Sequence, residues 1–210
     1  MATGFDTYRA EDVGRQAKAI KAKGYSFVGM YYFASSKFKQ QLTKAVATLL
    51  SAEGLYVVSV YENGYPTHSG YFSAAQGRAD GAMAVQRAGE AGQPKGTPIY
   101  AAVDYDSMER DLPAISAYFK SYQTILTAQG YTAGVYGNGW VCGAMHKAGL
   151  VGKTWLSGAT GWSGYAYWLK SADIVQGRTT QILGMDCDLD TTAASGGGGW
   201  QVTDCTCAFP

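Results

Sequence analysis

Short apolar runs alternate with stretches of helical periodicity along most of the chain. Continuous apolar runs such as LYVVSVYE at 55–62 are typical of parallel strands that are covered on both faces. The predicted strands occupy residues 3–7, 27–33, 55–62, 98–106, 132–138, 154–159, 173–183 and 185–192. The predicted helices occupy residues 10–23, 43–53, 71–91, 112–126 and 141–148.

This alternation predicts an α/β fold, and about eight strands in 210 residues fit one irregular TIM-like (β/α) barrel. The last two predicted strands have little or no helix between them, so we expect the barrel to have lost helices in its last third. An open doubly wound sheet is the alternative, and the lack of a phosphate-binding turn after the first strand disfavours it. The barrel is predicted to span residues 1–194, followed by a Gly-rich link and C-terminal tail at 195–210.

Charge is nearly balanced, at a net +1, and the chain has no basic run. Binding to nucleic acid or to an anionic membrane surface is therefore not expected. No apolar run reaches the roughly 18 residues that cross a membrane. The first ten residues, MATGFDTYRA, lack the basic and apolar regions of a signal peptide. A protein acting outside the cell would therefore have lost its leader or would use another export route.

The four cysteines are too few and too irregularly spaced to define a redox compartment. Cys205 and Cys207 flank one residue, a poor spacing for a disulfide with each other and not that of a zinc knuckle. A disulfide from this tail to Cys187 or to Cys142 is an open alternative that spacing does not decide.

Carboxylates stand at the ends of several predicted strands, where apolar runs normally exclude them. They are Asp6, Glu62, Asp104, Asp106, Asp186, Asp188 and Asp190. Because the C-terminal strand ends of a (β/α) barrel form its mouth, we expect these groups to meet there. Glycoside cleavage needs one protonated and one ionised carboxyl group, and clustered acids supply both states. Asp104 and Asp106 are expected on one face of a strand, with Cα atoms roughly 6.6 Å apart.

Other interpretations remain open for individual acids. Asp106, before Ser107, also suits a helix cap, and Asp190 is more typical of a cap or turn. Glu62, before Asn63-Gly64, also suits a solvated turn. An acid cluster could instead hold Mg²⁺ or Ca²⁺ through oxygen ligands.

Six segments form an ordered pattern from about residue 4 to residue 193, nearly the whole chain. They are GFDTY at 4–8, LTKAVATLLSAEGLYVVSVYE at 42–62, GRADGAMAV at 77–85, PIYAAVDYD at 98–106, AGVYGNG at 133–139 and DCDLDTT at 186–192. With these motifs the sequence resembles the DUF1906, or Rv2525c-like, glycoside-hydrolase-like domain. That family is similar to the family 25 glycoside hydrolases, the muramidase-type lysozymes, which cleave the bond between N-acetylmuramic acid and N-acetylglucosamine.

The resemblance implies an irregular (β/α) barrel with an acidic cleft. In the muramidases an Asp ends the first strand, an Asp-x-Glu pair ends the fourth, and another Asp lies on the last. Residue by residue, these positions match Asp6, Asp104 with Asp106, and Asp188. The chain departs from the pattern at Asp106, which is one methylene shorter than the Glu that acts as acid in the muramidases. Glu62, on the neighbouring strand, is the alternative acid.

These observations predict a glycosidase that cleaves bacterial peptidoglycan without a cofactor or metal. Tyr32, Tyr136, Asn138 and Trp155 are the predicted substrate-binding residues. The protein is expected to act as a monomer at the cell wall, as a phage lysin, a secreted hydrolase or a delivered effector. A non-catalytic barrel that binds cell-wall glycan is the alternative, and a metal-dependent hydrolase of another substrate is the third hypothesis.

Overall fold

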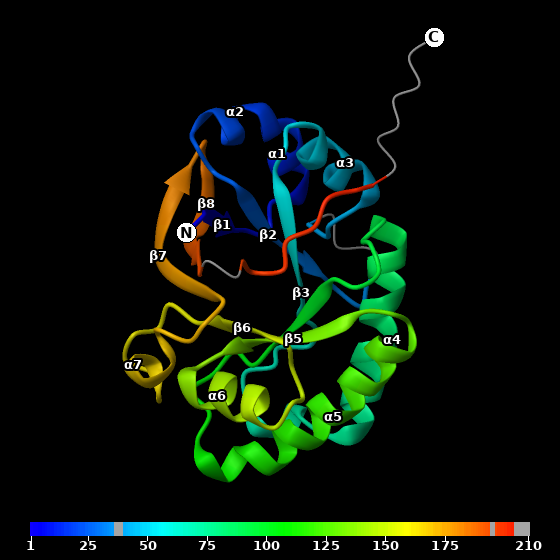
Figure 1. The fold of residues 1–210 in the computed structure, drawn as a ribbon, viewed down its shortest axis with the longest axis vertical. Helices are drawn as coiled ribbons and strands as arrows, with labels where there is room; N and C mark the ends of the chain where they lie inside the picture. The colour runs from blue at the N-terminus through cyan, green and yellow to red at the C-terminus, as the bar shows by residue number, and fades with distance from the viewer. Residues whose placement is uncertain (36–39, 194–195, 204–210) are drawn as a thin grey trace.

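Eight strands close into one barrel in chain order in the computed structural model, which describes residues 1–35, 40–193 and 196–203 (Figure 1). The strands are β1 (Thr3–Asp6), β2 (Phe27–Tyr32), β3 (Tyr56–Tyr61), β4 (Pro98–Ala102), β5 (Thr132–Gly137), β6 (Lys153–Leu156), β7 (Ile174–Ile182) and β8 (Met185–Thr192). The α-helices are α1 (Ala10–Arg15), α2 (Ala17–Ala22), α3 (Lys44–Ala52), α4 (Ala74–Ala91), α5 (Leu112–Ala128), α6 (Gly139–Lys147) and α7 (Tyr165–Trp168), and two 3₁₀ turns are η1 (Ser69–Tyr71) and η2 (Glu109–Asp111).

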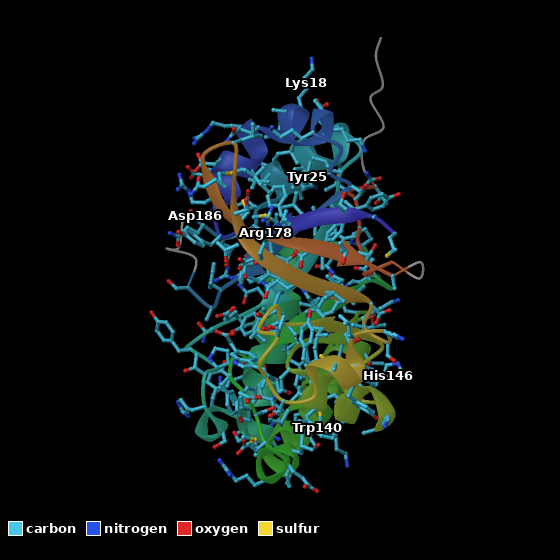
Figure 2. All side chains as sticks on the ribbon, turned by 90° about the vertical axis from the view of Figure 1, so that its left-hand side faces the viewer. Lys18, Tyr25, Trp140, His146, Arg178 and Asp186 are labelled. Carbon is cyan, nitrogen blue, oxygen red and sulfur yellow. The ribbon has the colours of Figure 1, made fainter. Side chains whose placement is uncertain are left out.

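The last strand makes the barrel irregular. Strands β1 to β7 run parallel to their neighbours, whereas β8 is antiparallel to both β7 and β1. A tight turn joins β7 to β8, with Leu183 at φ 52° and Gly184 at φ 78°, so this connection needs no helix. The β7–β8 pair forms the face toward the viewer in Figure 2, where Arg178 and Asp186 are labelled. The prediction of an irregular TIM-like (β/α) barrel is confirmed.

Helices α1 to α3 lie at one end of the long axis and α4 to α6 at the other (Figure 1). Side-chain caps begin several of them: Thr43 accepts a hydrogen bond from Val46 N in α3, and Ser73 accepts one from Gln76 N in α4. Their apolar faces pack on the outer surface of the barrel and form the main core. A second cluster fills the inside of the barrel, where Tyr100 and Trp155 are the largest rings.

Strand β4 is shorter than predicted, and this changes the site. It ends at Ala102 rather than reaching Asp106. Beyond it, Asp104 N donates a 3.0 Å hydrogen bond to Pro66 O, so the chain leaves the sheet for the loop that follows β3. The expected pairing of Asp104 and Asp106 on one strand face is therefore wrong, because neither residue lies in a strand.

Two further differences concern helices. The predicted helix over 10–23 is divided at Gln16 into α1 and α2. Helix α7 was not predicted, since its four residues are too few to show a helical period.

Residues 196–203 cover part of the end of the barrel opposite the carboxyl ends of the parallel strands, where they cross in front of the strands in Figure 1. Trp200 pairs with Val57 near the start of β3 through backbone hydrogen bonds of 2.8 and 2.9 Å. Its indole N–H donates to Ser59, and its side chain is buried. The division proposed at residue 194 stays a prediction.

Cys142 and Cys187 are buried free thiols. Cys205 and Cys207, for which a disulfide to Cys187 or Cys142 was left open, lie outside the described residues.

Candidate active site

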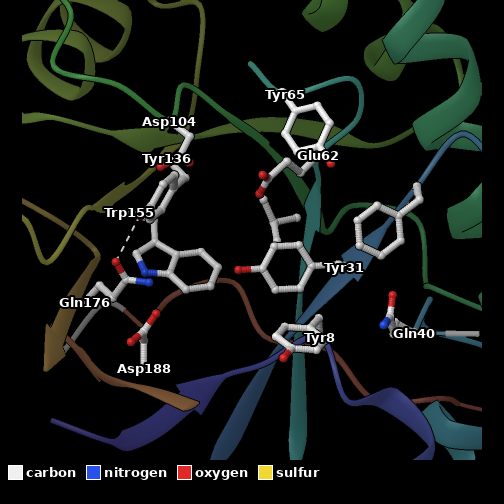
Figure 3. A pocket seen from close by; sticks show the side chains of 12 residues that line it. Tyr8, Tyr31, Gln40, Glu62, Tyr65, Asp104, Tyr136, Trp155, Gln176 and Asp188 are labelled. Carbon is white, nitrogen blue, oxygen red and sulfur yellow. Dashed lines mark hydrogen bonds between the residues drawn. The ribbon is translucent and has the colours of Figure 1, made fainter. Parts of the chain in front are cut away.

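A cavity of about 610 Å³ opens at the carboxyl ends of the parallel strands. It is lined by Tyr8, Tyr31, Phe33, Gln40, Val60, Glu62, Tyr65, Asp104, Tyr136, Trp155, Gln176 and Asp188 (Figure 3). The mixture of aromatic rings with carboxyl and amide groups is typical of a site that binds a polar ligand with flat apolar faces, such as a sugar.

Glu62 and Asp104 point into this cavity above the rings of Tyr31 and Trp155 (Figure 3). Glu62 directly follows β3, and Asp104 lies two residues beyond β4. Burial first, and then the charges of Asp104 and Asp6, raise the pKa of Glu62 to about 7. Burial also raises the pKa of Asp104. A carboxyl group that keeps its proton near neutral pH is what a general acid requires.

Asp6, at the end of β1, lies inside the barrel beneath the cavity. Its Oδ1 accepts a 2.8 Å hydrogen bond from Tyr31, and its Oδ2 accepts one of 2.9 Å from Gln176. Burial raises the pKa of Asp6 to about 6, although these two hydrogen bonds act to lower it. Gly29 makes this arrangement possible, since a Cβ there would lie 2.6 Å from the Trp155 ring and 2.7 Å from Asp6 Cβ.

Asp188 and Asp190 lie on the inner face of β8, beside Asp6 of the neighbouring strand β1. Asp188 stands directly opposite Asp6 in the β1–β8 pair and lines the cavity. Asp190 is buried deeper, and its Oδ1 accepts a 3.0 Å hydrogen bond from the indole N–H of Trp155. Burial first, and then the charge of Asp6, raise the pKa of Asp190 well above its ordinary value.

The surroundings of Asp190 Oδ2 indicate which of the two buried acids, Asp6 or Asp190, holds a proton. Asp190 Oδ2 is buried and meets no N–H or hydroxyl donor in the described part of the chain. The carboxyl groups of Asp6 and Asp190 are hydrogen-bonded to each other. Two carboxyl groups can share such a bond only when one is protonated, and the larger upward shift in the pKa of Asp190 favours the proton on Asp190. The sequence offered only the weaker interpretation of Asp190 as a cap or turn residue.

The structure places Asp106 away from the cavity, contrary to its predicted role as a catalytic acid. Its Oδ1 accepts hydrogen bonds from Ser163 N at 2.7 Å and from Asn138 Nδ2 at 2.9 Å. Burial acts to raise the pKa of Asp106, but the hydrogen bonds from Ser163 and Asn138 outweigh it and lower the pKa. An anion stabilised in this way is a poor proton donor.

Asn138 is likewise structural rather than substrate-binding. It is buried at the N-terminus of α6, where its Oδ1 caps the helix by accepting from Val141 N at 3.0 Å. Its Nδ2 donates to Asp106 and to Ser107 O. Both ends of the amide are thus occupied by protein groups.

Of the predicted aromatic residues Tyr32, Tyr136 and Trp155, two line the cavity and one does not. Tyr136 and Trp155 line the cavity, with Trp155 at its floor and only 1% exposed, and their role in substrate binding stays a prediction. The prediction for Tyr32 is wrong: its ring is buried outside the barrel, and its hydroxyl donates to Gln93 at 2.9 Å. Tyr31, one residue earlier, faces the cavity instead.

Seven other residues that line the cavity were not predicted from the sequence. They are Tyr8, Tyr31, Phe33, Gln40, Val60, Tyr65 and Gln176. Alternation along β2 could have found Tyr31, because Phe27 and Gly29 share its inward face. Gln176 carried the signal of a polar side chain within a strand, whereas Tyr8, Gln40 and Tyr65 come from loops that show no pattern.

Two further findings concern metal ions and membranes. In residues 1–35, 40–193 and 196–203, no group of three or more His, Cys, Asp or Glu side chains has an arrangement that could hold a metal ion. None of the helices formed by these residues is long and apolar enough to cross a membrane.

The family is settled by comparison with known sequences. Residues 18–192 match the family described as "Rv2525c-like, glycoside hydrolase-like domain". The chain belongs to this family. A Bacillus subtilis (strain 168) protein, "Uncharacterized protein YbfG", is 33% identical over 164 residues, which cover 71% of this chain and 22% of that protein. The chain thus spans about a fifth of the length of that relative.

Solved structures show the same fold at low sequence identity. The Mycobacterium tuberculosis Tat-secreted protein Rv2525c, in complex with L-tartrate, has a TM-score of 0.79 at 23% identity and matches 95% of this chain and 98% of its own. A muramidase from Trichobolus zukalii has a TM-score of 0.58 at 14% identity, with 92% and 94% covered. A lysozyme from Streptomyces coelicolor has a TM-score of 0.58 at 11% identity, with the same coverage. The Rv2525c-like barrel is therefore a glycoside hydrolase-like domain with structural similarity to muramidases.

Proposed function

We propose that this barrel is a glycoside hydrolase that cleaves the glycan strands of bacterial peptidoglycan, with Glu62 as the general acid. The observation that carries the proposal is the position of Glu62 and Asp104 in one aromatic-lined cavity, with the pKa of Glu62 raised to about 7. The similarity of the fold to muramidases supports the choice of substrate. Action at the cell wall is part of the same proposal.

The reaction needs a proton for the leaving-group oxygen and negative charge beside the developing oxocarbenium ion. Glu62 supplies the proton, since its pKa of about 7 leaves a large share of this carboxyl group protonated near neutral pH. Asp104 and Asp188 line the same cavity and supply the negative charge when ionised. The pair Asp6 and Asp190 adds a further charge from below, held in place by Tyr31 and Gln176. Tyr136 and Trp155 provide ring surfaces for the sugar.

A second candidate function, glycan binding without cleavage, is favoured by one specific observation. The position where the muramidase pattern has its acid is occupied by Asp106, and the structure turns this side chain toward Ser163 and Asn138. If Glu62 does not replace the missing acid, the cavity holds glycan without cutting it.

The experiment that separates the two is release of reducing sugar from purified peptidoglycan by the wild type, Glu62→Gln, Asp104→Asn and Asp106→Asn. We expect release by the wild type, a loss of at least about 10²-fold for Glu62→Gln and for Asp104→Asn, and retention for Asp106→Asn. No release by the wild type, with peptidoglycan still bound, would replace the hydrolase by the binding function. Loss in Asp106→Asn alone would move the acid back to Asp106.

A further inference from the structure

Exposed large hydrophobic side chains gather on the surface formed by α6 and α7, outside the cavity. Trp140 and Tyr167 are 48% and 50% exposed, and their ring centroids lie 5.5 Å apart at an interplanar angle of 32°. Figure 2 shows Trp140 at the lower end of the molecule, away from His146 at the other end of α6. Met108 and Leu169, from the adjoining segments, are also exposed.

The loops that carry this aromatic pair are held firmly together by Asp106. Its carboxylate accepts from Ser163 N and from Ser163 Oγ, and Trp140 N in turn donates to Ser163 O at 3.4 Å. Gly139 and Gly164 let the two backbones touch, because a Cβ on Gly139 would lie 1.9 Å from Gly164 O. The rings are therefore presented by a fixed scaffold rather than by a mobile loop, which reduces the entropy lost on binding.

The chemistry of the pair fits a sugar better than a protein or lipid partner. The hydroxyl of Tyr167 is hydrogen-bonded to Lys147, whose Nζ lies 5.0 Å from the Tyr167 ring centroid. Two ring faces edged by an ammonium, a hydroxyl and an indole N–H match a pyranose, which has an apolar C–H face and polar hydroxyl edges. A stable protein interface buries roughly 800 Å² per partner, which two half-exposed rings do not supply.

We propose that Trp140 and Tyr167 form a second carbohydrate-binding surface, which contacts sugar rings of the glycan polymer outside the cavity. The proposal depends on the proposed function only for the identity of the polymer, bacterial peptidoglycan. Continuity with the cavity supports it: Asp104 lines the cavity, and Asp106, two residues later, holds the scaffold of the pair. The loops after β4, β5 and β6 lie at the same end of the barrel as the mouth. A second contact raises the effective concentration of the barrel on an insoluble polymer.

The test measures binding to purified peptidoglycan in a Glu62→Gln background, so that the polymer stays intact. We expect Trp140→Ala combined with Tyr167→Ala to weaken binding at least tenfold. Leu49→Ala removes a side chain of similar exposure, 49%, from α3 and is expected to change binding less than twofold. Thermal unfolding of each protein checks that the substitutions leave the fold intact, and Trp140→Phe, which keeps a ring, should lose less than Trp140→Ala.

Unchanged affinity in the folded double variant would overturn the proposal, as would an absence of any binding by the Glu62→Gln protein. Because the readout is binding, a wild type that releases no reducing sugar contradicts the hydrolase and leaves this surface to be judged on its own result. Hydrolysis by the wild type, together with equal binding by the double variant, overturns this surface alone.

Discussion

Gln176 Nε2 donates a 2.9 Å hydrogen bond to Oδ2 of Asp6 and so joins β7 to β1 inside the barrel. The amide of Gln176 has only one possible orientation, because its Oε1 accepts from Tyr136 at 3.0 Å and from Gly158 N at 3.1 Å. Its N–H groups must therefore face the carboxylate. The hydrogen bond from Gln176 thus favours the ionised form of Asp6, against the effect of burial, without adding a charge.

The first prediction is that Gln176→Met raises the pKa of Asp6 above about 6. The substitution keeps the length of the side chain but removes the donor that favours the ionised form. Titration of the Asp6 carboxyl carbon by NMR measures the shift, with Gln123→Met on the exposed face of α5 as control. An unchanged midpoint would show that the hydrogen bond does not control this charge.

The second prediction concerns the pH dependence of hydrolysis, if the proposed function holds. Activity should fall as pH rises above about 7, because Glu62 then loses the proton that it donates. It should also fall below about 6, as Asp6 becomes protonated and its charge disappears. Initial rates on peptidoglycan between pH 4 and 9 test both limbs. Activity that keeps rising to pH 9 would rule out Glu62 as the acid.

The third prediction is that Asp190→Asn stabilises the fold at neutral pH. The pKa of Asp190 is raised in the folded state, so folding takes up a proton once the pH exceeds the unfolded value. Wild-type stability from this group is therefore greatest in acid and is lost as pH rises toward the folded pKa. Asparagine can donate to Asp6 and accept from Trp155 without needing a proton.

Urea unfolding at pH 4 and pH 8 checks this. The variant should match the wild type at pH 4 and exceed it at pH 8. Asp190→Ala leaves Trp155 Nε1 without its acceptor and should be less stable at both pH values, by about 1–3 kcal/mol. A variant Asp190→Asn that is less stable than wild type at pH 8 would mean that Asp190 is ionised.

The fourth prediction separates structure from chemistry at Asp106. Asp106→Ala breaks its bonds to Ser163 and Asn138 and should lower the free energy of unfolding by about 1–3 kcal/mol. Glu109→Ala, in the exposed turn that follows, should change it by less than about 0.5 kcal/mol. Urea unfolding measures both. Equal effects would show that the loops are not held by Asp106.

The fifth prediction uses two glycines of one helix. A Cβ on Gly77 would lie 2.2 Å from Tyr118 O, so Gly77→Ala forces α4 away from α5 and should cost about 1–3 kcal/mol. A Cβ on Gly89 meets nothing within 4 Å, so Gly89→Ala should stabilise the protein by about 0.5–1 kcal/mol. Thermal unfolding of the two variants should shift in opposite directions. A shift of the same sign would contradict the close packing of α4 on α5.

Most of the barrel could be predicted because its parallel strands are buried on both faces and so appear as apolar runs. The apolar pattern does not show where strand β4 ends. In PIYAAVDYD the apolar run continues past Ala102, although the backbone leaves the sheet there and bonds to Pro66. Because the backbone leaves the sheet at this hydrogen bond, Asp104 and Asp106 do not lie together on one strand face.

The site was predictable where an acid follows an apolar run, as at Asp6, Glu62 and Asp104. It was not predictable where two neighbouring residues are alike. Tyr31 and Tyr32 have the same chemistry, and only the register of β2 decides which one faces the cavity. The role of Asp190 depends on burial beside Asp6 and Trp155, which local sequence does not record.

The pairing of Trp200 with Val57 near the start of β3 bears on how this barrel can be joined to other sequence. Ala2 and Gly199 line one hollow, so both ends of the described barrel lie on the side opposite the cavity. A segment joined at either end starts from that side and leaves the mouth open to a bulky polymer.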